Sequence, residues 1–146
     1  MAWMADPALR HDIAELVHRY CDAVTRQDLE RWASCWAADG RWELRADRVA
    51  TDAESRLAIL LHAFGSLEAV VQNALHGSVR REGDAAASGR WYIVEHLRRA
   101  SGEPAMLLAR YDDRYVREDG GWRFAARTLV PHYQGPPDLT GRFFRG

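Results

Sequence analysis

The stretch that decides the fold is AMLLARYDDRYVREDGGWRFAARTLVPHY, residues 105–133. Apolar and polar side chains alternate on both sides of Asp119-Gly120-Gly121, a tripeptide typical of a hairpin turn. Because the alternation is long on each side, we expect two antiparallel strands, near residues 105–118 and 122–133. The end of the chain is thus predicted to be a sheet.

The same period of two continues toward the N-terminus, and it is interrupted again by residues that favour turns. We expect two further strands near residues 70–81 and 85–97, with turns at residues 82–84 and 101–104. Together the four segments predict a four-stranded antiparallel meander. Residues 134–146 form a tail whose prolines cannot continue a ladder of hydrogen bonds, and we expect it to wrap over the domain or a partner subunit.

Three helices are predicted upstream of the sheet, each starting at an aspartate that can cap its first turn. We expect them from Asp6-Pro7 to about Thr25, from Asp28 to Asp39-Gly40, and from Asp52 to Gly65, with a short strand at residues 41–44. Trp32 and Trp36 fall on one face of the second helix, where they are typical of a core. Helices followed by antiparallel strands indicate an α+β fold with the helices on one face of a curved sheet.

Composition excludes several classes of protein. The chain has 146 residues, 47% hydrophobic and 28% charged, which is typical of a single globular domain. A net charge of −1 gives no electrostatic reason to expect nucleic acid or an anionic membrane as a partner. The N-terminal segment lacks the features of a signal peptide, and no long apolar run occurs, so we expect a cytoplasmic protein.

Residue usage also limits the chemistry. All 20 basic residues are arginines, which excludes a Schiff-base lysine. Cys21 and Cys35 lie in apolar helical patterns without a short spacing, so we expect two buried, reduced thiols. The six histidines form neither HxH nor HExxH, and we therefore expect no metal site.

Several motifs occur in a characteristic order: residues 13–20 (IAELVHRY), residues 28–36, Gly83-Asp84-Ala85, residues 110–115 (RYDDRY) and residues 119–124 (DGGWRF). This order resembles that of SnoaL-like proteins of the nuclear transport factor 2 superfamily, which include scytalone dehydratase, bile acid 7α-dehydratase and hexachlorocyclohexane dehydrochlorinase. The resemblance implies one SnoaL-like domain over residues 1–146, in which a cone-shaped curved antiparallel sheet wraps around N-terminal helices. It also implies an apolar pocket closed by the first helix, and a homodimer or homotrimer formed through the outer face of the sheet.

The resemblance further implies positions for catalytic residues. Dehydratase-like members carry a tyrosine on the first helix, an aspartate five residues later, a histidine in the first long strand and an arginine near the end of the last strand. Tyr20 and Arg127 match the first and last of these positions, whereas Thr25 and Gln72 stand at those of the Asp-His pair. Thr and Gln can bind a ligand by hydrogen bonds but cannot accept a proton near neutral pH. Core packing for Tyr20 and a structural ion pair for Arg127 are the alternatives.

Strand alternation suggests other groups for proton transfer. It puts Gln72 and His76 on one face, and a histidine with an ordinary pKa near 6.5 is the best remaining acid or base. A neutral, hydrogen-bonded histidine is the alternative. Arg110 and Asp112 also share a face of their strand. Asp112 could be a carboxylate of the pocket with Arg110 as its partner, and the alternative is an ion pair on the surface. Glu95 lies on the same side of its strand as Trp91, and alternation alone leaves open whether that side faces inward.

Together with the resemblance, these residues lead us to expect a cofactor-independent lyase, isomerase or cyclase with dehydratase-like acid-base chemistry. Its substrate would be a small hydrophobic metabolite, such as a polyketide of secondary metabolism. His76, Tyr20 and Arg127 are the candidate catalytic residues, and the candidate substrate-binding residues are Gln72, Thr25, Arg110 and Asp112. Two alternatives stay open. One is a non-catalytic binding or accessory protein that has lost the Asp-His dyad, and the other is an enzyme resembling epoxide hydrolase, suggested by the Arg-x-Asp pattern of residues 110–112.

Overall fold

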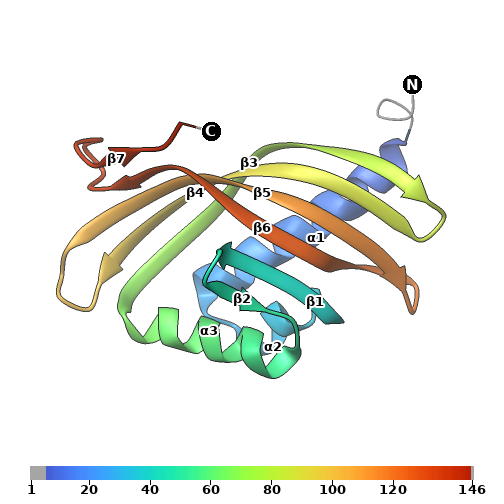
Figure 1. Cartoon of the computed structure of the whole chain (residues 1–146), viewed down its shortest axis with the longest axis horizontal. Coiled ribbons are helices and arrows are strands. Elements are labelled where there is room, and N and C mark those ends of the chain that lie inside the picture. Colours follow the sequence, from blue (N-terminus) through green and yellow to red (C-terminus); the bar gives the residue numbers. More distant parts are fainter. Residues whose placement is uncertain (1–5, 146) are drawn as a thin grey trace.

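A computed structural model describes residues 6–145 and shows helices packed against a curved sheet (Figure 1). The helices are α1 (Pro7–Arg26), α2 (Leu29–Ala33) and α3 (Ala53–Gly65). The strands are β1 (Trp36–Arg45), β2 (Arg48–Ala50), β3 (Leu67–Gly83), β4 (Ala86–Arg99), β5 (Pro104–Glu118), β6 (Gly121–Gly135) and β7 (Arg142–Phe143). The four long strands and the turns between them are confirmed.

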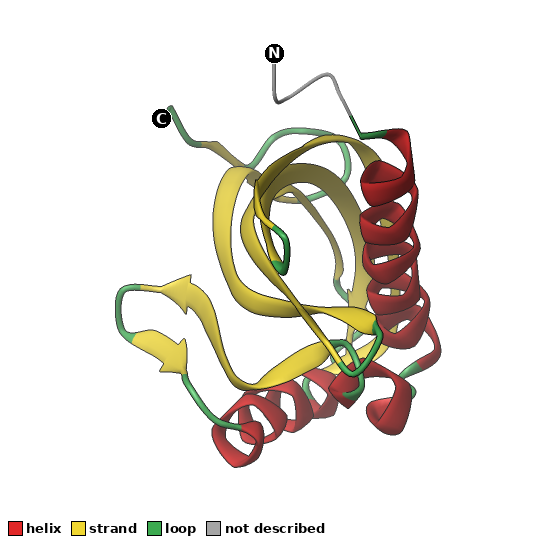
Figure 2. Cartoon of the chain, turned by 90° about the vertical axis from the view of Figure 1, so that its right-hand side faces the viewer, coloured by secondary structure: helices red, strands yellow, loops and turns green. Residues whose placement is uncertain are grey.

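The strands form one sheet in the order β2-β1-β6-β5-β4-β3, with β7 also paired to β6. The predicted antiparallel meander is confirmed as β3 to β6. β1, however, runs parallel to β6, so the sheet as a whole is mixed. Figure 2 shows the sheet curling around a central space, with α1 along one side and α3 below it. The predicted α+β architecture is therefore confirmed, with one parallel pair added.

Helix α1 begins and ends where its sequence directs. The Asp6 side chain accepts a hydrogen bond from the backbone N–H of Leu9 (2.9 Å), and Pro7 occupies the first turn. The helix stops at Gln27, which adopts a left-handed conformation with φ of 53°. Its buried face includes Ile13 and Tyr20, and it packs mainly against β3. This contact covers the concave face of the sheet with apolar side chains.

The second predicted helix is shorter than its apolar pattern indicates. It ends at Ala33, and Trp36, the last residue of the predicted stripe, already belongs to β1. Pairing with β6 ends the helix and starts the strand at this point, because the N–H of Phe124 donates to the carbonyl of Cys35 (2.8 Å). Trp36 and Trp32 still contact each other, with ring centroids 5.6 Å apart, and both are buried. The prediction that these tryptophans belong to the core is confirmed.

The C-terminal tail folds back on the sheet. β6 extends to Gly135, and the tail then reverses so that β7 pairs with residues 133–134. The hydroxyl of Tyr133 fixes this reversal by accepting from the N–H of Gly141 (2.8 Å). The ladder of β6 ends at Gly135, immediately before the prolines at 136 and 137, and the short strand β7 that pairs after the reversal is an element that the sequence does not predict.

Both cysteines are buried and free, as predicted. Burial raises the pKa of Cys21 to about 11, and it also raises the pKa of Cys35. Each thiol therefore stays protonated near neutral pH. None of the described helices is both long and apolar enough to cross a membrane.

Candidate functional site

A cavity of about 150 Å³ lies between the helices and the concave face of the sheet. We call it the inner cavity. Its lining is mostly apolar and comes from α1, α3, β1, β2, β3, β4, β5 and β6: Tyr20, Val24, Trp42, Leu44, Arg48, Leu60, Ala63, Phe64, Leu67, Val70, Gln72, Ile93, Glu95, Leu107, Tyr111 and Leu129. A concave, mostly apolar hollow with a few convergent polar groups is the usual form of a small-molecule site.

The acidic group of the inner cavity is Glu95. Its Oε2 accepts a hydrogen bond from Nε2 of Gln72 at 2.8 Å, directly across the β3–β4 pairing. Burial raises the pKa of the Glu95 carboxyl above its ordinary value, and the hydrogen bond from Gln72 opposes the rise. A carboxyl with a raised pKa in an apolar cavity is suited to exchange a proton with a ligand.

Two polar atoms in the lining have no partner among the described residues. Oε1 of Gln72 is buried and accepts no hydrogen bond, although its Nε2 is occupied by Glu95. Nε1 of Trp42 is buried and donates to nothing. Because an unpaired buried polar group costs free energy, these two atoms are available to pair with a ligand or with water in the cavity.

Tyr20 and Tyr111 form one wall of the inner cavity, with ring centroids 6.0 Å apart in an edge-to-face arrangement. Burial raises the pKa of Tyr20 well above the ordinary tyrosine value and raises that of Tyr111. Both phenols therefore stay protonated and can donate a hydrogen bond to a ligand oxygen. The structure places Tyr20 in the cavity, where the sequence analysis expects it.

Arg127 stands behind this wall and does not line the cavity. Its guanidinium carbon lies 4.5 Å from the ring centroid of Tyr20 and 3.8 Å from that of Tyr111. Its Nε and Nη2 donate to the two oxygens of Asp113, at 2.8 and 3.1 Å, and both side chains are fully buried. The alternative of a structural ion pair is therefore the one that the contacts favour for Arg127.

The charges of this ion pair are held by their surroundings. Burial, the largest single influence, lowers the pKa of Arg127, but the surrounding groups, chiefly Asp113, together raise the pKa, so the guanidinium stays charged. Burial raises the pKa of Asp113, whereas Arg127 and the hydroxyl of Tyr115, which donates to Asp113 at 2.8 Å, act in the opposite direction. The two tyrosines of the cavity wall thus stand in front of a permanent positive charge.

Thr25 contacts the cavity only through the backbone of Gln72. Its Oγ1 accepts a hydrogen bond from the N–H of Gln72 at 2.9 Å and donates to the carbonyl of the same residue at 3.4 Å. Thr25 is absent from the residues that line the cavity. It therefore fixes α1 against β3 at the position where Gln72 enters the cavity.

His76 points away from the inner cavity. β3 contains a bulge at Leu75-His76, where two residues oppose the single residue Tyr92 of β4. The extra residue reverses the alternation, so His76 is exposed on the outer face, with its ring stacked 4.4 Å from Tyr92. The predicted placement of His76 beside Gln72 is therefore wrong, because strict alternation does not hold along β3.

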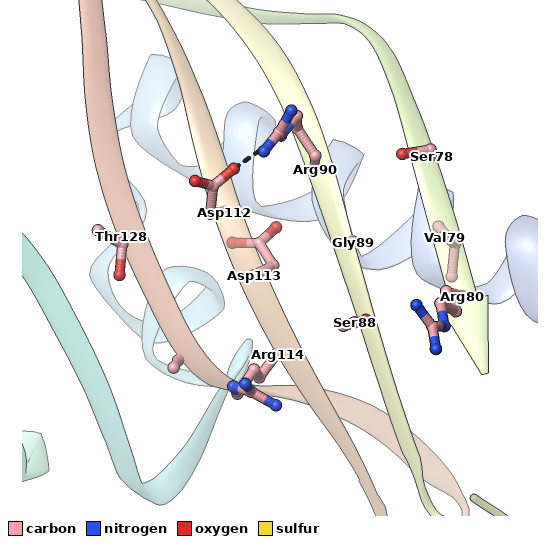
Figure 3. Close-up of a pocket in the computed structure, with 11 residues that line it drawn as sticks. Ser78, Val79, Arg80, Ser88, Gly89, Arg90, Asp112, Asp113, Arg114 and Thr128 are labelled. Atoms are coloured by element: carbon pink, nitrogen blue, oxygen red, sulfur yellow. Dashed lines mark hydrogen bonds and ion pairs between the residues drawn. The ribbon is translucent and has the colours of Figure 1, made fainter. Parts of the chain in front are cut away.

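Asp112 lines a groove of about 510 Å³ on the outer face (Figure 3). Arg110 lies on the same face and donates to Asp112. Asp112 accepts from Arg90 at 2.9 Å and from Arg110 at 3.2 Å, and Arg110 also contacts Nε2 of His132 at 3.2 Å. The surface pair left open by the sequence is the arrangement present, and the Arg-x-Asp pattern does not reach the inner cavity. The carboxylate that does face inward on this strand is Asp113, one residue later.

Glu95 is the residue that sequence reasoning missed. Its only signal is that a carboxylate interrupts the apolar run WYIVEHL on the same side of the strand as Trp91, which the structure buries in the core. Among residues 6–145, no three histidine, cysteine, aspartate or glutamate side chains lie close enough together to hold a metal ion.

The sequence of this chain matches a known protein family. Residues 7–128 match the family model described as the SnoaL-like domain, which is most of the chain. The protein belongs to the SnoaL-like family. A search of the curated proteins gives no significant match for this SnoaL-like chain.

Solved structures resemble this SnoaL-like protein over nearly its whole length. Hexachlorocyclohexane dehydrochlorinase LinA-type3 from Novosphingobium barchaimii is 19% identical, with 95% of each chain covered and a TM-score of 0.81. A scytalone dehydratase-like protein from Novosphingobium aromaticivorans is 16% identical, covering 94% of this chain and 90% of that one, with a TM-score of 0.83. A protein of unknown function from Mycobacterium tuberculosis is 26% identical, covering 87% and 77%, with a TM-score of 0.73. The first two similarities establish the fold.

Proposed function

We propose that this SnoaL-like protein is a cofactor-independent lyase or isomerase that moves a proton of a small hydrophobic molecule within the inner cavity. The observation that supports this most is the Glu95 carboxyl, hydrogen-bonded to Gln72 and surrounded by apolar lining. Structural similarity to a dehydrochlorinase and a dehydratase-like protein agrees with elimination chemistry. A polyketide-like or other compact cyclic molecule is the expected type of substrate.

In this proposal Glu95 replaces the missing Asp-His pair. Its carboxylate removes a proton from a carbon next to a carbonyl or a leaving group, and the electron pair of that C–H bond forms the new double bond as the leaving group departs or an enolate develops. Gln72 holds the carboxylate through its amide N–H. The protonated phenols of Tyr20 and Tyr111 are available to donate to a developing oxyanion.

Proton exchange tests this role without knowledge of the natural substrate. In heavy water, the protein should accelerate deuterium uptake at the activated carbon of cyclic ketones such as 2-tetralone, read by mass spectrometry. Glu95→Gln keeps the size of the side chain and should lower the rate by about 100-fold or more, while Glu95→Asp should retain part of it. Equal rates for the wild type and Glu95→Gln would show that Glu95 is not the base.

The non-catalytic alternative makes the opposite prediction in the same experiment. A binding protein would retain cyclic ketones in the inner cavity, and the cavity-filling variant Ala63→Phe would release them, but no ketone would exchange faster than in buffer. Ala63 is a suitable position because it lies on α3 and lines the cavity.

We further propose that the protein forms a homodimer or homotrimer through the outer face of the sheet. Val71 and Leu75 are large hydrophobic residues of β3 that are 46% and 58% exposed. Beside them, Tyr92 stacks between His76 and His132, with centroid distances of 4.4 and 5.7 Å. Exposed apolar and aromatic side chains on a regular surface are typical of an interface.

A further inference from the structure

A second hollow adjoins the inner cavity at the open end of the sheet. It has a volume of about 550 Å³, and we call it the vestibule. Its lining is Leu44, Arg45, Arg48, Leu107, Leu129, Pro131, Gln134, Arg142 and Phe144. Leu44, Arg48, Leu107 and Leu129 line both hollows, so the vestibule adjoins the cavity that holds Glu95.

Three guanidinium groups surround the vestibule, contributed by β1, β2 and β7. Arg48 is half-buried and makes no ion pair or side-chain hydrogen bond with any residue in the described part of the chain. Arg45 contacts only Asp47, at 3.5 Å, in a pair whose side chains are 65% and 81% exposed. Arg142 lies over the ring of Phe144, 4.6 Å from its centroid, and pairs with no carboxylate in residues 6–145.

Carboxylates are scarce at the same place. Within the lining of the two hollows, Glu95 is the only acidic residue, and it belongs to the inner cavity alone. The two hollows thus differ in charge, with the Glu95 carboxyl in the inner cavity and three arginines around the vestibule, of which Arg48 lies at the boundary. Because the other residues shared by the two hollows are leucines, a ligand that contacts both regions needs an apolar body.

We propose that the ligand is an amphipathic carboxylic acid, whose compact apolar body fills the inner cavity and whose carboxylate binds Arg48 and Arg142 in the vestibule. This inference rests on the proposed function and adds the substrate class to it. Guanidinium groups bind carboxylates through two parallel hydrogen bonds, a geometry that favours an organic anion over a neutral polar group. The reacting carbon then lies on the Glu95 side of the molecule, away from the anionic end.

Equilibrium binding tests this substrate class independently of catalysis. The probes are 5-phenylpentanoate and its neutral primary amide, which have the same shape, measured by isothermal titration calorimetry. The acid should bind about tenfold more tightly than the amide, the scale of one charge-assisted hydrogen bond, and the difference should shrink in high salt.

Substitutions of the vestibule arginines test which of them causes the preference for the acid over the amide. Arg48→Gln and Arg142→Gln should each reduce the preference for the acid, and the double variant should remove it, whereas Arg48→Lys should keep part of it. Arg117→Gln is the matched control, because Arg117 is an exposed arginine near the opposite end of β5. It should leave the preference unchanged. Thermal unfolding of each variant verifies that it is folded.

Glu95→Gln separates this inference from the proposed function. If the carboxylate of the probe lies in the vestibule, this variant should keep the acid preference even though it no longer exchanges protons. Tighter binding of the acid by Glu95→Gln would instead place the probe's carboxylate beside Glu95 and overturn the proposal. Three other results would also overturn the proposal. The wild type could bind the acid and the amide equally, the double arginine variant could keep the preference for the acid, or neither probe could bind.

Discussion

Two carboxylates of the concave face differ in what surrounds them. Asp113 is fully buried, but two nitrogens of Arg127 and the Tyr115 hydroxyl occupy its oxygens. Glu95 has one hydrogen bond, from Gln72, and otherwise faces apolar lining. A carboxylate whose oxygens are all bonded is held as a structural charge, whereas one with free lone pairs can accept a proton. The number of hydrogen-bond partners therefore distinguishes the two carboxylates better than the depth of burial does.

The raised pKa of Glu95 makes a prediction about stability and pH. Because the folded protein binds this proton more tightly than the unfolded chain, its contribution to the free energy of unfolding is complete below the ordinary glutamate pKa of about 4.3. It is lost as pH rises through the raised pKa of the folded state. Glu95→Gln, which cannot ionise, should escape that loss, so its stability relative to the wild type should increase with pH.

Urea unfolding of both proteins over a series of pH values measures this difference. Other titrating groups, including Asp113, are common to the two proteins and cancel from the comparison. Rates of proton exchange by the wild type should rise over the same pH interval, because the base is the ionised form. A stability difference that does not change with pH would mean that the Glu95 pKa is not raised.

Breaking the buried ion pair between Asp113 and Arg127 should lower the stability of the folded protein. Asp113→Asn leaves the Arg127 guanidinium buried without an opposite charge, and we expect a loss of about 3–5 kcal/mol in the free energy of unfolding. Asp112→Asn is the matched control on the neighbouring residue, because its pairs with Arg90 and Arg110 are partly exposed to solvent and their loss should cost no more than about 1 kcal/mol. Similar unfolding midpoints in urea for the two variants would contradict this account.

At the scale of the element, the bulge in β3 decides which side chains enter the inner cavity. On its N-terminal side the inward residues are Val70, Gln72 and Ala74, and beyond it the inward position is Gly77. Gly77 has no side chain where the ring of Trp91 approaches, since an added Cβ would lie 2.4 Å from that ring. The bulge and the glycine together let β3 bend around the tryptophan.

Gly77→Ala should therefore destabilise the protein by about 1–3 kcal/mol, because the backbone or Trp91 must move to make room. Gly65→Ala is the control, since a Cβ at the end of α3 would contact nothing within 4 Å. It should be neutral or slightly stabilising. Chemical denaturation of the two variants in parallel gives the comparison, and equal effects would argue against the steric explanation.

Local signals explain why the elements could be predicted and the site only in part. Caps such as Asp6 and Asp52, and the turn at residues 119–121, act within a few residues, so the sequence alone locates α1, α3 and the long strands. The bulge adds one residue without any change in composition, and this is why His76 is misplaced. The inward side of β4 is set by packing on α1, a contact that alternation does not reveal for Glu95.

At the scale of the whole molecule, the sheet has one covered face and one open face. Helices α1 and α3 and the inner cavity occupy the concave side, whereas the outer face carries the exposed residues Val71 and Leu75. The proposed reaction and the proposed self-association therefore use opposite sides of the same strands. Substitutions in the outer face should change assembly without entering the cavity.

Leu75→Asp tests the proposed interface, because it places a charge on the most exposed apolar residue of the outer face. Native mass spectrometry should find a dimer or trimer for the wild type and a monomer for the variant. Leu139→Asp is the control, since Leu139 is 49% exposed but belongs to the C-terminal tail. An unchanged subunit number in Leu75→Asp, or a monomeric wild type, would exclude this interface.

The rate at which the two buried thiols are chemically labelled reports on the unfolding of the molecule. Cys21 belongs to α1 and Cys35 lies between α2 and β1, and neither exposes a reactive thiolate while the protein is folded. A thiol reagent can modify them only when the helices separate from the sheet, so the labelling rate counts opening events. If one cooperative unit unfolds, both residues should be labelled at the same rate. A ligand that fills the inner cavity should slow both by the same factor, which makes labelling a search method for the natural substrate.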